Sequence, residues 1–462
     1  MSRHIMRLLG KGASTLPGKI GLSFCPNLLA HLAKDVRCIV VTGTNGKTTT
    51  SRMIEQTLID SGAAYFCNKS GANMMNGITT EFIMNSSLGG RAKKDFALIE
   101  CDEAAFKYVS KQVDAECVVA TNVFRDQLDR YGEITHTLSN IRIGLQNSKN
   151  ATVCLNADCS LTASLKDDID NDIVMYGVNL PIYKEHIKES SDAPYCIHCK
   201  HEYEYEYITF GHLGKYYCPN CGYSRPEPDV AVTDIYVSDA DHSEIGITFG
   251  GSFAQNDPNE KNTSAEKCLG SKYNAAVNLP GGYNIYNAVA AVTVARVMGF
   301  DTKTSIDALS TFECGFGRME KFMLEDTETR MILIKNPAGC NQVLNFLSNI
   351  NSKTLFVVCL NDNYADGTDI SWIWDVDFES LQKIEDNLTG VLVSGIRADE
   401  MAMRFKYAGI PEEKIKVIKD YEKLIDEFTS QDAPVYIMPT YTAMMDLRAI
   451  VSKKFGYKNF WE

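Results

Sequence analysis

The sequence predicts an α/β protein of two domains, with a small module inserted into the first domain. Three observations indicate this fold class. Residues 38–61 (CIVVTGTNGKTTTSRMIEQTLIDS) read as a buried strand, a Gly- and Thr-rich turn and a helix with one apolar face. From Met331 onward, short apolar runs alternate with helical stretches, as in a doubly wound parallel sheet. Between these regions lie two Cys-x-x-Cys pairs, which are typical of a metal-binding insertion.

The composition limits the class of protein. A chain of 462 residues is long enough for two or three domains, and its formal charge of −13 argues against a nucleic-acid-binding surface. No run of about 18 apolar residues is present, so we expect no transmembrane helix. Fifteen cysteines without a secretory signal indicate free thiols and a cytoplasmic location.

Residues 1–37 are expected to form a helical segment ahead of the first domain. The start of this segment is basic, with Arg3, Arg7, Lys11 and Lys19. A basic helix can lie on an anionic membrane, which would place the protein peripherally at the inner face of the cell membrane. It can also be a packing helix at the edge of the first domain. The sequence leaves both interpretations open.

The turn after the first strand is a candidate phosphate-binding loop. Gly43 and Gly46 allow the backbone to approach an anion closely, and the amides at the start of the helix point toward that anion. Lys47 adds a positive charge, and Thr48 offers a hydroxyl for Mg²⁺. An ordinary strand-to-helix turn is the alternative, but the flanking strand and helix favour phosphate binding. The candidate ligand-binding residues are Gly43, Thr44, Asn45, Gly46, Lys47, Thr48 and Thr49.

A second strand, Phe96–Ile99, is followed by the acids Glu100, Asp102 and Glu103. The carboxyl ends of neighbouring parallel strands meet at one edge of a sheet, so a carboxylate here is well placed to hold Mg²⁺ beside Thr48. Solvated acids are also common at strand ends. We predict Glu100 as the magnesium ligand and as a catalytic residue, and rank Glu103 lower.

The inserted module has the spacing of a zinc ribbon. Two cysteine pairs are separated by residues 200–217, and four thiolates in two tight turns make a closed tetrahedral site. Such a site has no open coordination position, so the predicted zinc is structural. Chance spacing is the alternative, and three nearby histidines could replace a ligand. The predicted ligands are Cys196, Cys199, Cys218 and Cys221.

Several segments resemble the Mur ligase superfamily, whose members activate a carboxylate with ATP and join it to an amine. The segments are TGTNGKTT (42–49), TNVFRDQLDRYG (121–132), NAD (156–158), GYNIYNA (282–288) and GRME (317–320). The resemblance implies an ATP- and Mg²⁺-binding central domain over residues 38–315, with the ribbon at 190–228. It also implies that Asn287 contacts the nucleotide base and that Arg318 is one of the nucleotide-binding residues. Gln127 stands where the family usually has His, which leaves a second metal there open.

The C-terminal region, predicted as a separate α/β domain over 316–462, narrows the resemblance to the MurT family. The features that carry it are KNPAG (335–339), DNYADGTDISWIWD (362–375), the ribbon and the short segment before the phosphate loop. Members of this family pair with GatD, a glutamine amidotransferase subunit. The resemblance implies a heterodimeric carbon–nitrogen ligase with glutamine as amido donor. It would amidate the α-carboxylate of D-glutamate in the lipid II stem peptide at the membrane surface, through an acyl phosphate, in peptidoglycan synthesis.

The histidine content supports the need for a partner. Glutamine hydrolysis requires a Cys nucleophile and a His base, and the last histidine of this chain is His242. The C-terminal domain therefore cannot supply the base. The resemblance implies that this chain contributes the acid that orients the partner's histidine, and we predict Asp369 for this catalytic role. For Asp362 and Asp366, a role toward the chain's own substrate site stays open.

Two other functions remain possible on the sequence. One is a ligase of the Mur or folylpolyglutamate type, which adds an amino acid in place of ammonia. The other is a P-loop scaffold that binds a partner through its ribbon and turns over no substrate.

Overall fold

The computed structural model describes residues 15–68, 72–87, 89–125, 134–182, 191–238, 242–250, 272–312, 318–347 and 352–457. The chain forms two compact units, each described here by itself. The first comprises Met1–Phe124, Ile134–Lys184 and Ser191–Glu313, and the second comprises Arg125–Glu133, Glu185–Ser190 and Cys314–Glu462. The domain boundaries expected from the sequence stay predictions, because the junction expected at 315/316 lies outside the described residues.

The first unit is built on a nine-stranded sheet with the order β11-β10-β9-β6-β5-β4-β1-β3-β2 among the described residues. All neighbouring strands from β2 to β9 run parallel, whereas β10 and β11 are antiparallel additions at one edge. The strands are β1 (Arg37–Thr42), β2 (Tyr65–Cys67), β3 (Phe96–Glu100), β4 (Ala115–Ala120), β5 (Thr152–Asn156), β6 (Ile173–Val178), β9 (Val230–Ser238), β10 (Ser243–Phe249) and β11 (Lys272–Val277).

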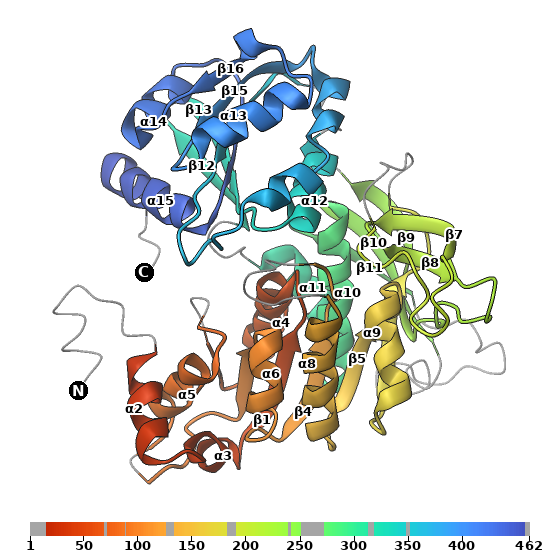
Figure 1. Ribbon diagram of the computed structural model, residues 1–462. Helices are drawn as coiled ribbons and strands as arrows, with labels where there is room; N and C mark the ends of the chain where they lie inside the picture. The colour runs from red at the N-terminus through yellow and green to blue at the C-terminus, as the bar shows by residue number, and fades with distance from the viewer. Residues whose placement is uncertain are drawn as a thin grey trace. The chain divides into compact units, whose positions relative to one another are not determined.

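Helices connect the parallel strands of this sheet (Figure 1). One group, α4, α10 and α11, packs together, and α6 packs against α8. The strands that they cover are almost entirely buried, which explains their continuous apolar runs. The helices are α2 (Leu16–Phe24), α3 (Leu28–Ala33), α4 (Lys47–Asp60), α5 (Met75–Met84), α6 (Glu103–Val109), α8 (Ile134–Asn147), α9 (Ser160–Ser164), η1 (Leu165–Asp168), α10 (Gly282–Val297) and α11 (Thr302–Thr311).

The register of the central strands decides what lies beside the phosphate loop. Val41 of β1 pairs with Glu100 of β3, and Thr42 of β1 pairs with Ala120 of β4. The segments that follow β3 and β4 therefore begin at the same edge of the sheet as the turn after β1. The sequence predicted this convergence from the parallel strand pattern.

The inserted module is a two-stranded antiparallel hairpin, β7 (Glu204–Phe210) and β8 (Leu213–Tyr217), flanked by the two cysteine pairs. Gly211 lies in the turn between the two strands with a φ of +56°, and Gly214 is the second residue of β8 with a φ of +157°. At Gly214 an added Cβ would lie 2.3 Å from the carbonyl oxygen of Tyr207, so the hairpin excludes any larger residue there.

The second unit contains a six-stranded sheet with the order β12-β13-β17-β14-β15-β16 in the described part of the chain. The pairs from β13 to β16 are parallel, as predicted, but β12 pairs antiparallel with β13 and was not expected as a strand. The strands are β12 (Arg318–Leu324), β13 (Thr327–Ile332), β14 (Thr354–Cys359), β15 (Leu388–Ser394), β16 (Ile415–Val417) and β17 (Val435–Pro439). The helices are α12 (Pro337–Leu347), η3 (Ser371–Asp375), η4 (Phe378–Ile384), α13 (Ala398–Tyr407), η5 (Glu412–Lys414), α14 (Tyr421–Thr429) and α15 (Tyr441–Phe455).

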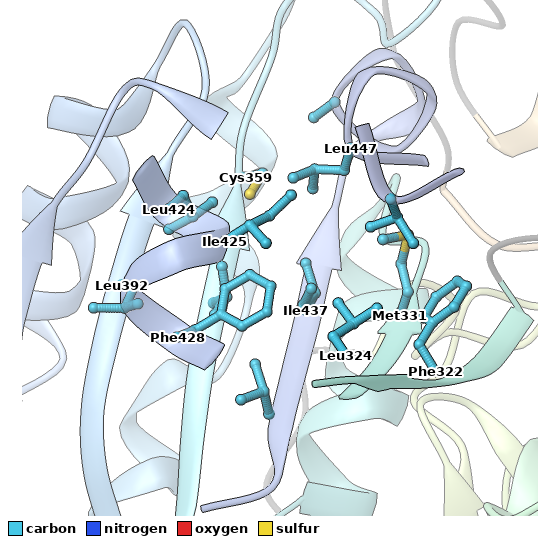
Figure 2. Close-up of a cluster of buried hydrophobic side chains, with 14 of the residues drawn as sticks. Phe322, Leu324, Met331, Cys359, Leu392, Leu424, Ile425, Phe428, Ile437 and Leu447 are labelled. Carbon is cyan, nitrogen blue, oxygen red and sulfur yellow. The ribbon is translucent and has the colours of Figure 1, made fainter. Parts of the chain in front are cut away.

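Figure 2 shows one side of the core of this unit. Leu424, Ile425 and Phe428 of α14 lie over Cys359 of β14 and Ile437 of β17, and all five side chains are at most 1% exposed. Burial of this apolar face holds α14 on the sheet, because helix propensity alone rarely stabilises so short a helix.

Two short helices, α2 and α3, precede β1, so the described part of the predicted N-terminal segment is helical. Gly18 of α2 packs so closely on α5 that an added Cβ would lie 1.9 Å from the carbonyl oxygen of Asn76. Within the described ranges, every helix is too short or too polar to cross a membrane.

Candidate nucleotide and metal sites

The turn between β1 and α4 has the backbone of a phosphate-binding loop. Gly43 and Gly46 have φ values of +120° and +86°, which favour glycine. A Cβ at Gly43 would lie 2.3 Å from Thr121 Oγ1, and one at Gly46 would lie 2.2 Å from Asn287 Oδ1. Glycine is thus required at both positions by conformation and by space.

Residues that follow β4 hold the loop in place. The Thr44 amide donates to the carbonyl oxygen of Asn122 at 2.9 Å, and the Asn45 amide donates to Asn122 Oδ1 at 3.0 Å. The Thr121 hydroxyl donates to the carbonyl oxygen of Asn45 at 2.7 Å. These three hydrogen bonds fix the Thr121–Asn122 pair and the loop against each other. In the sequence, this pair stands out only through its resemblance to a family segment.

Lys47 is buried at the start of α4, and its ammonium group is surrounded by oxygen atoms. Nζ donates to the carbonyl oxygens of Gly43 and Thr44, the latter at 3.1 Å, and lies 3.0 Å from Glu103 Oε2. Burial lowers the pKa of Lys47, but the negative charges of Glu103 and Asp102 outweigh it, so the pKa is raised overall. Lys47 is therefore a fixed cation in the loop. Glu103, ranked below Glu100 from the sequence, is the carboxylate that contacts it.

Thr48 and Glu100, the two residues predicted to hold Mg²⁺, lie side by side. Thr48 Oγ1 donates to Glu100 Oε1 at 3.1 Å. Both backbone groups of Glu100 are fixed by Asn68, whose side chain accepts from the Glu100 amide at 2.8 Å and donates to its carbonyl oxygen at 2.7 Å. A hydroxyl and a carboxylate oxygen held together in this way fit a hard divalent cation. Thr49, the next predicted residue, is buried in the first turn of α4.

Asn287 lies on α10 directly against the loop. Its Oδ1 accepts from the Thr50 hydroxyl at 3.3 Å, and its Nδ2 donates to Asn284 Oδ1 at 3.0 Å. The structure thus places Asn287 beside Gly46, and the role expected for it toward the base stays a prediction. Arg318 is the first residue of β12, but its side chain lies outside the described residues, as does Gln127.

The four predicted metal ligands come together at the base of the hairpin. The Sγ atoms of all four cysteines lie within 4.8 Å of one another. In each turn, the amide of the residue after the second cysteine donates to the carbonyl oxygen of the first, from Lys200 at 2.9 Å and from Gly222 at 3.0 Å. Lys200 and Gly222 have φ values of +64° and +77°, so the two turns share one geometry. Four soft sulfur ligands at this spacing could hold a metal ion.

The histidine alternatives do not join this cluster. Among the described residues, only the four cysteines form a group of possible ligands. His212 is fully buried elsewhere, with Nε2 at 3.4 Å from Cys159 Sγ and its ring against Phe124. Burial lowers the pKa of His212 to about 3, so its ring is neutral. His198 lies on the surface, 3.7 Å from Asp167.

The three carboxylates of the acidic loop after β14, in the second unit, have different surroundings. Asp366 is buried, and its carboxylate contacts the start of α15. Its oxygens accept hydrogen bonds from the Thr442 amide at 2.7 Å and from the Thr442 hydroxyl at 2.5 Å. Asp362 lies 3.6 Å from Arg397 Nε. Asp369 is partly exposed, and its Oδ1 accepts from the Ser371 amide at 2.8 Å. Asp366 therefore has a structural role, whereas Asp369 keeps a carboxylate at the surface.

Exposed aromatic side chains lie on η3 and α13 of the same unit. Trp374 is 51% exposed and Tyr407 is 70% exposed, and their rings meet edge to face with centroids 5.6 Å apart. The Arg404 guanidinium lies 5.4 Å from the Trp374 ring centroid. Large exposed aromatic groups of this kind often mark contact surfaces.

Two family models match the chain. Residues 41–223 match the Mur ligase middle domain, and residues 333–444 match the MurT ligase C-terminal domain. A pseudomurein peptide ligase type C from Methanothermus fervidus shares the fold, with a TM-score of 0.66, 21% identity and coverage of 90% of this chain and 79% of that chain. Together with the parallel sheet and the phosphate loop, these matches define a Mur ligase-type protein.

Curated relatives narrow this class. The chain is 35% identical to the MurT subunit of lipid II isoglutaminyl synthase (glutamine-hydrolyzing) from Streptococcus pneumoniae. The similarity extends over 457 residues, which are 98% of this chain and 95% of that protein. It is 34% identical to the corresponding Staphylococcus aureus subunit, over 98% of this chain and 96% of that one. The chain therefore belongs to the MurT family.

Proposed function

We propose that this chain is the ligase subunit of a lipid II isoglutaminyl synthase. It amidates the α-carboxylate of D-glutamate in the lipid II stem peptide to D-isoglutamine, at the expense of ATP, in peptidoglycan synthesis. The observation that carries this proposal is the 35% identity to the Streptococcus pneumoniae MurT subunit over nearly the full length of both chains. The enzyme class is a carbon–nitrogen ligase that uses glutamine as amido donor.

The phosphate loop accounts for the ATP-dependent step. A carboxylate oxygen attacks the terminal phosphorus of ATP, and ADP leaves. Ammonia then attacks the acyl carbon, phosphate leaves, and an amide forms. Lys47 has three ammonium protons and three oxygen partners within the chain, so a phosphate oxygen must replace one of these partners. The neighbouring Glu103 keeps the lysine charged and in place during that exchange.

Thr48 and Glu100 are proposed to hold Mg²⁺, which supplies charge stabilisation at the transferring phosphate when bound. The hydrogen bond between their side chains keeps the two oxygens in one place. Asn68 fixes the backbone of Glu100 from the neighbouring loop. Asn287 and Arg318 are proposed to contact the nucleotide.

The four-cysteine cluster is proposed to hold one structural Zn²⁺. Its four Sγ atoms leave no position for a substrate, and the small hairpin has only a small apolar core of its own, around Tyr203 and Tyr216. Metal binding would stabilise the fold of this module, which its small apolar core alone cannot do.

A partner is proposed to supply ammonia. A GatD-like glutamine amidotransferase subunit would bring the Cys nucleophile and the His base. Residues 314–462 cannot provide that base, because the last histidine of the chain is His242. Asp369 is proposed to complete this constellation by orienting the partner's histidine. The two chains would form a heterodimer in the cytoplasm and meet lipid II at the inner face of the membrane.

An assay of ATP consumption tests the proposal against its rivals. The chain is incubated with lipid II and Mg-ATP, with and without a GatD-like subunit plus glutamine, with free ammonia, or with amino acids. Consumption that requires ammonia, or glutamine with the partner, supports the proposal. Consumption that requires an amino acid indicates a Mur or folylpolyglutamate type of ligase. No consumption under any condition indicates a scaffold.

A further inference from the structure

The ribbon is joined to the first unit through a buried ion pair. Arg225 follows the second cysteine pair, and its amide donates to the carbonyl oxygen of Tyr216 in β8 at 3.0 Å. Its guanidinium reaches into the unit, where Nε lies 2.6 Å from Asp158 Oδ1. The side chains of Arg225 and Asp158 are 2% and 0% exposed. The metal-binding module thus inserts a positive charge into the interior of the nucleotide-binding unit.

The second oxygen of Asp158 connects this pair to α10. Asp158 Oδ2 accepts from the Tyr286 hydroxyl at 2.5 Å and from the Val178 amide at 3.1 Å. The Tyr286 hydroxyl also lies 2.7 Å from Thr209 Oγ1, on strand β7 of the hairpin. Hairpin and ion pair therefore meet at one hydroxyl group, that of Tyr286.

Tyr286 is the residue next to Asn287, which contacts the phosphate loop. Asn287 Oδ1 accepts from Thr50 and occupies the space that a side chain at Gly46 would need. A chain of direct contacts thus runs from the ribbon to the phosphate loop, through Arg225, Asp158 and α10.

Disturbing this series of contacts is expected to destabilise the protein. A buried ion pair that loses one partner leaves an uncompensated charge in the interior, which is strongly destabilising. The second cysteine turn holds the start of the Arg225 segment, because the Cys218 amide donates to the carbonyl oxygen of Tyr223 at 2.7 Å. Loosening of this turn would release Arg225, and Asp158 and Tyr286 would have to rearrange.

We propose that the ribbon positions α10 at the phosphate loop through Arg225, Asp158 and Tyr286, so that metal binding at the four cysteines and nucleotide binding favour each other. These three are positioning residues and do not touch the reacting atoms. The inference rests on the proposed nucleotide and metal sites, and it adds a regulatory link between them. Because coupling between two sites is reciprocal, a bound nucleotide must also raise the affinity for the metal by the same factor.

The test compares Tyr286→Phe with Tyr217→Phe in the full chain. Tyr217 is a matched control, because its hydroxyl donates to Glu204 within the exposed part of the hairpin and does not reach α10. Calorimetry measures the Kd of a non-hydrolysable ATP analogue with Mg²⁺. Competition with a chromogenic chelator at equilibrium measures the affinity for zinc with and without that analogue. Thr209→Val is a second variant that removes the hairpin's own contact with Tyr286.

We expect Tyr286→Phe to weaken nucleotide binding about fivefold or more, with zinc content unchanged, and Tyr217→Phe to match the wild type. The nucleotide should raise the zinc affinity of the wild type but not that of Tyr286→Phe. If the wild type binds zinc and nucleotide but its zinc affinity does not change with the nucleotide, the inference is wrong and the proposed function stands. If the wild type binds no nucleotide, the proposed function itself fails.

Discussion

Lys47 has two roles that must be separated experimentally. Its ammonium group is the charge expected at the transferring phosphate, and it is also the cation that compensates the buried carboxylate of Glu103. Replacement of Lys47 alone therefore removes a catalytic charge and leaves a buried acid unpaired, which lowers stability. The sequence motif indicates the first role, but nothing near Lys47 in the sequence indicates the second. Glu103 is 56 residues away along the chain, and only the fold brings it to Lys47.

Lys47→Ala is expected to lower ATP-dependent amidation at least about a hundredfold, because a preorganised charge at the developing transition state is lost. The measurement is ammonia-driven amidation of lipid II. The double variant Lys47→Met with Glu103→Gln removes both charges and serves as the control for folding. It should melt near the wild type and remain inactive. Near-normal activity in a folded variant would refute the role of Lys47.

The acids of the C-terminal loop show what a sequence cannot decide. Asp362, Asp366 and Asp369 are alike in type and lie within a few residues of one another. The structure separates them through long-range contacts, since Asp366 accepts hydrogen bonds from Thr442 at the start of α15, 76 residues away. Asp369 precedes the Trp-containing segment, and its role toward a partner stays a prediction.

Asp369→Asn is expected to lower glutamine hydrolysis by the complex about a hundredfold or more, because the partner's histidine would lose its orienting carboxylate. Complex formation and ATP binding should be unchanged, and ammonia-driven amidation should fall far less. Asp399→Asn, an exposed acid on α13, is the control. An equal loss of glutamine-driven and ammonia-driven activity would assign Asp369 to the ligase reaction instead.

At the scale of elements, the hydrophobic pattern of the sequence predicts the position of a strand well where that strand is buried on both faces. The strands β1, β4 and β14 are continuous apolar runs, and their positions follow from hydrophobicity alone. Strand β12 was missed, because the resemblance marked its start as a junction between domains and its pairing with β13 depends on the turn at residues 325–326.

The ribbon is predicted to carry one tightly bound zinc per chain. Replacing one cysteine of each turn, as in Cys196→Ser with Cys218→Ser, should abolish stoichiometric zinc and unfold the hairpin, because four thiolates are needed to close the site. Elemental analysis of the purified protein is the measurement. Cys340→Ser, which changes a buried cysteine of the second unit, should retain the zinc. Full zinc content in the double variant would exclude these ligands.

For the whole molecule, the sequence predicted the α/β class, the phosphate loop and the four-cysteine spacing because each is encoded in a short segment. It could not predict the network that joins them. Asp158 follows β5, Arg225 follows the hairpin and Tyr286 lies on α10, so their pairing depends on where the ribbon docks on the sheet. A buried Asp or Arg has no local signature, since its partner is defined only after the chain has folded.

We propose that this molecule is half of a two-chain enzyme in which nitrogen passes from glutamine to lipid II. The most direct measurement follows that nitrogen. Glutamine labelled with heavy nitrogen in its amide is supplied with Mg-ATP, lipid II, this chain and a GatD-like subunit, and the product is analysed by mass spectrometry. We predict labelled D-isoglutamine in the stem peptide only when both chains and ATP are present. Unlabelled product, labelling without this chain, or addition of an intact amino acid would contradict the account.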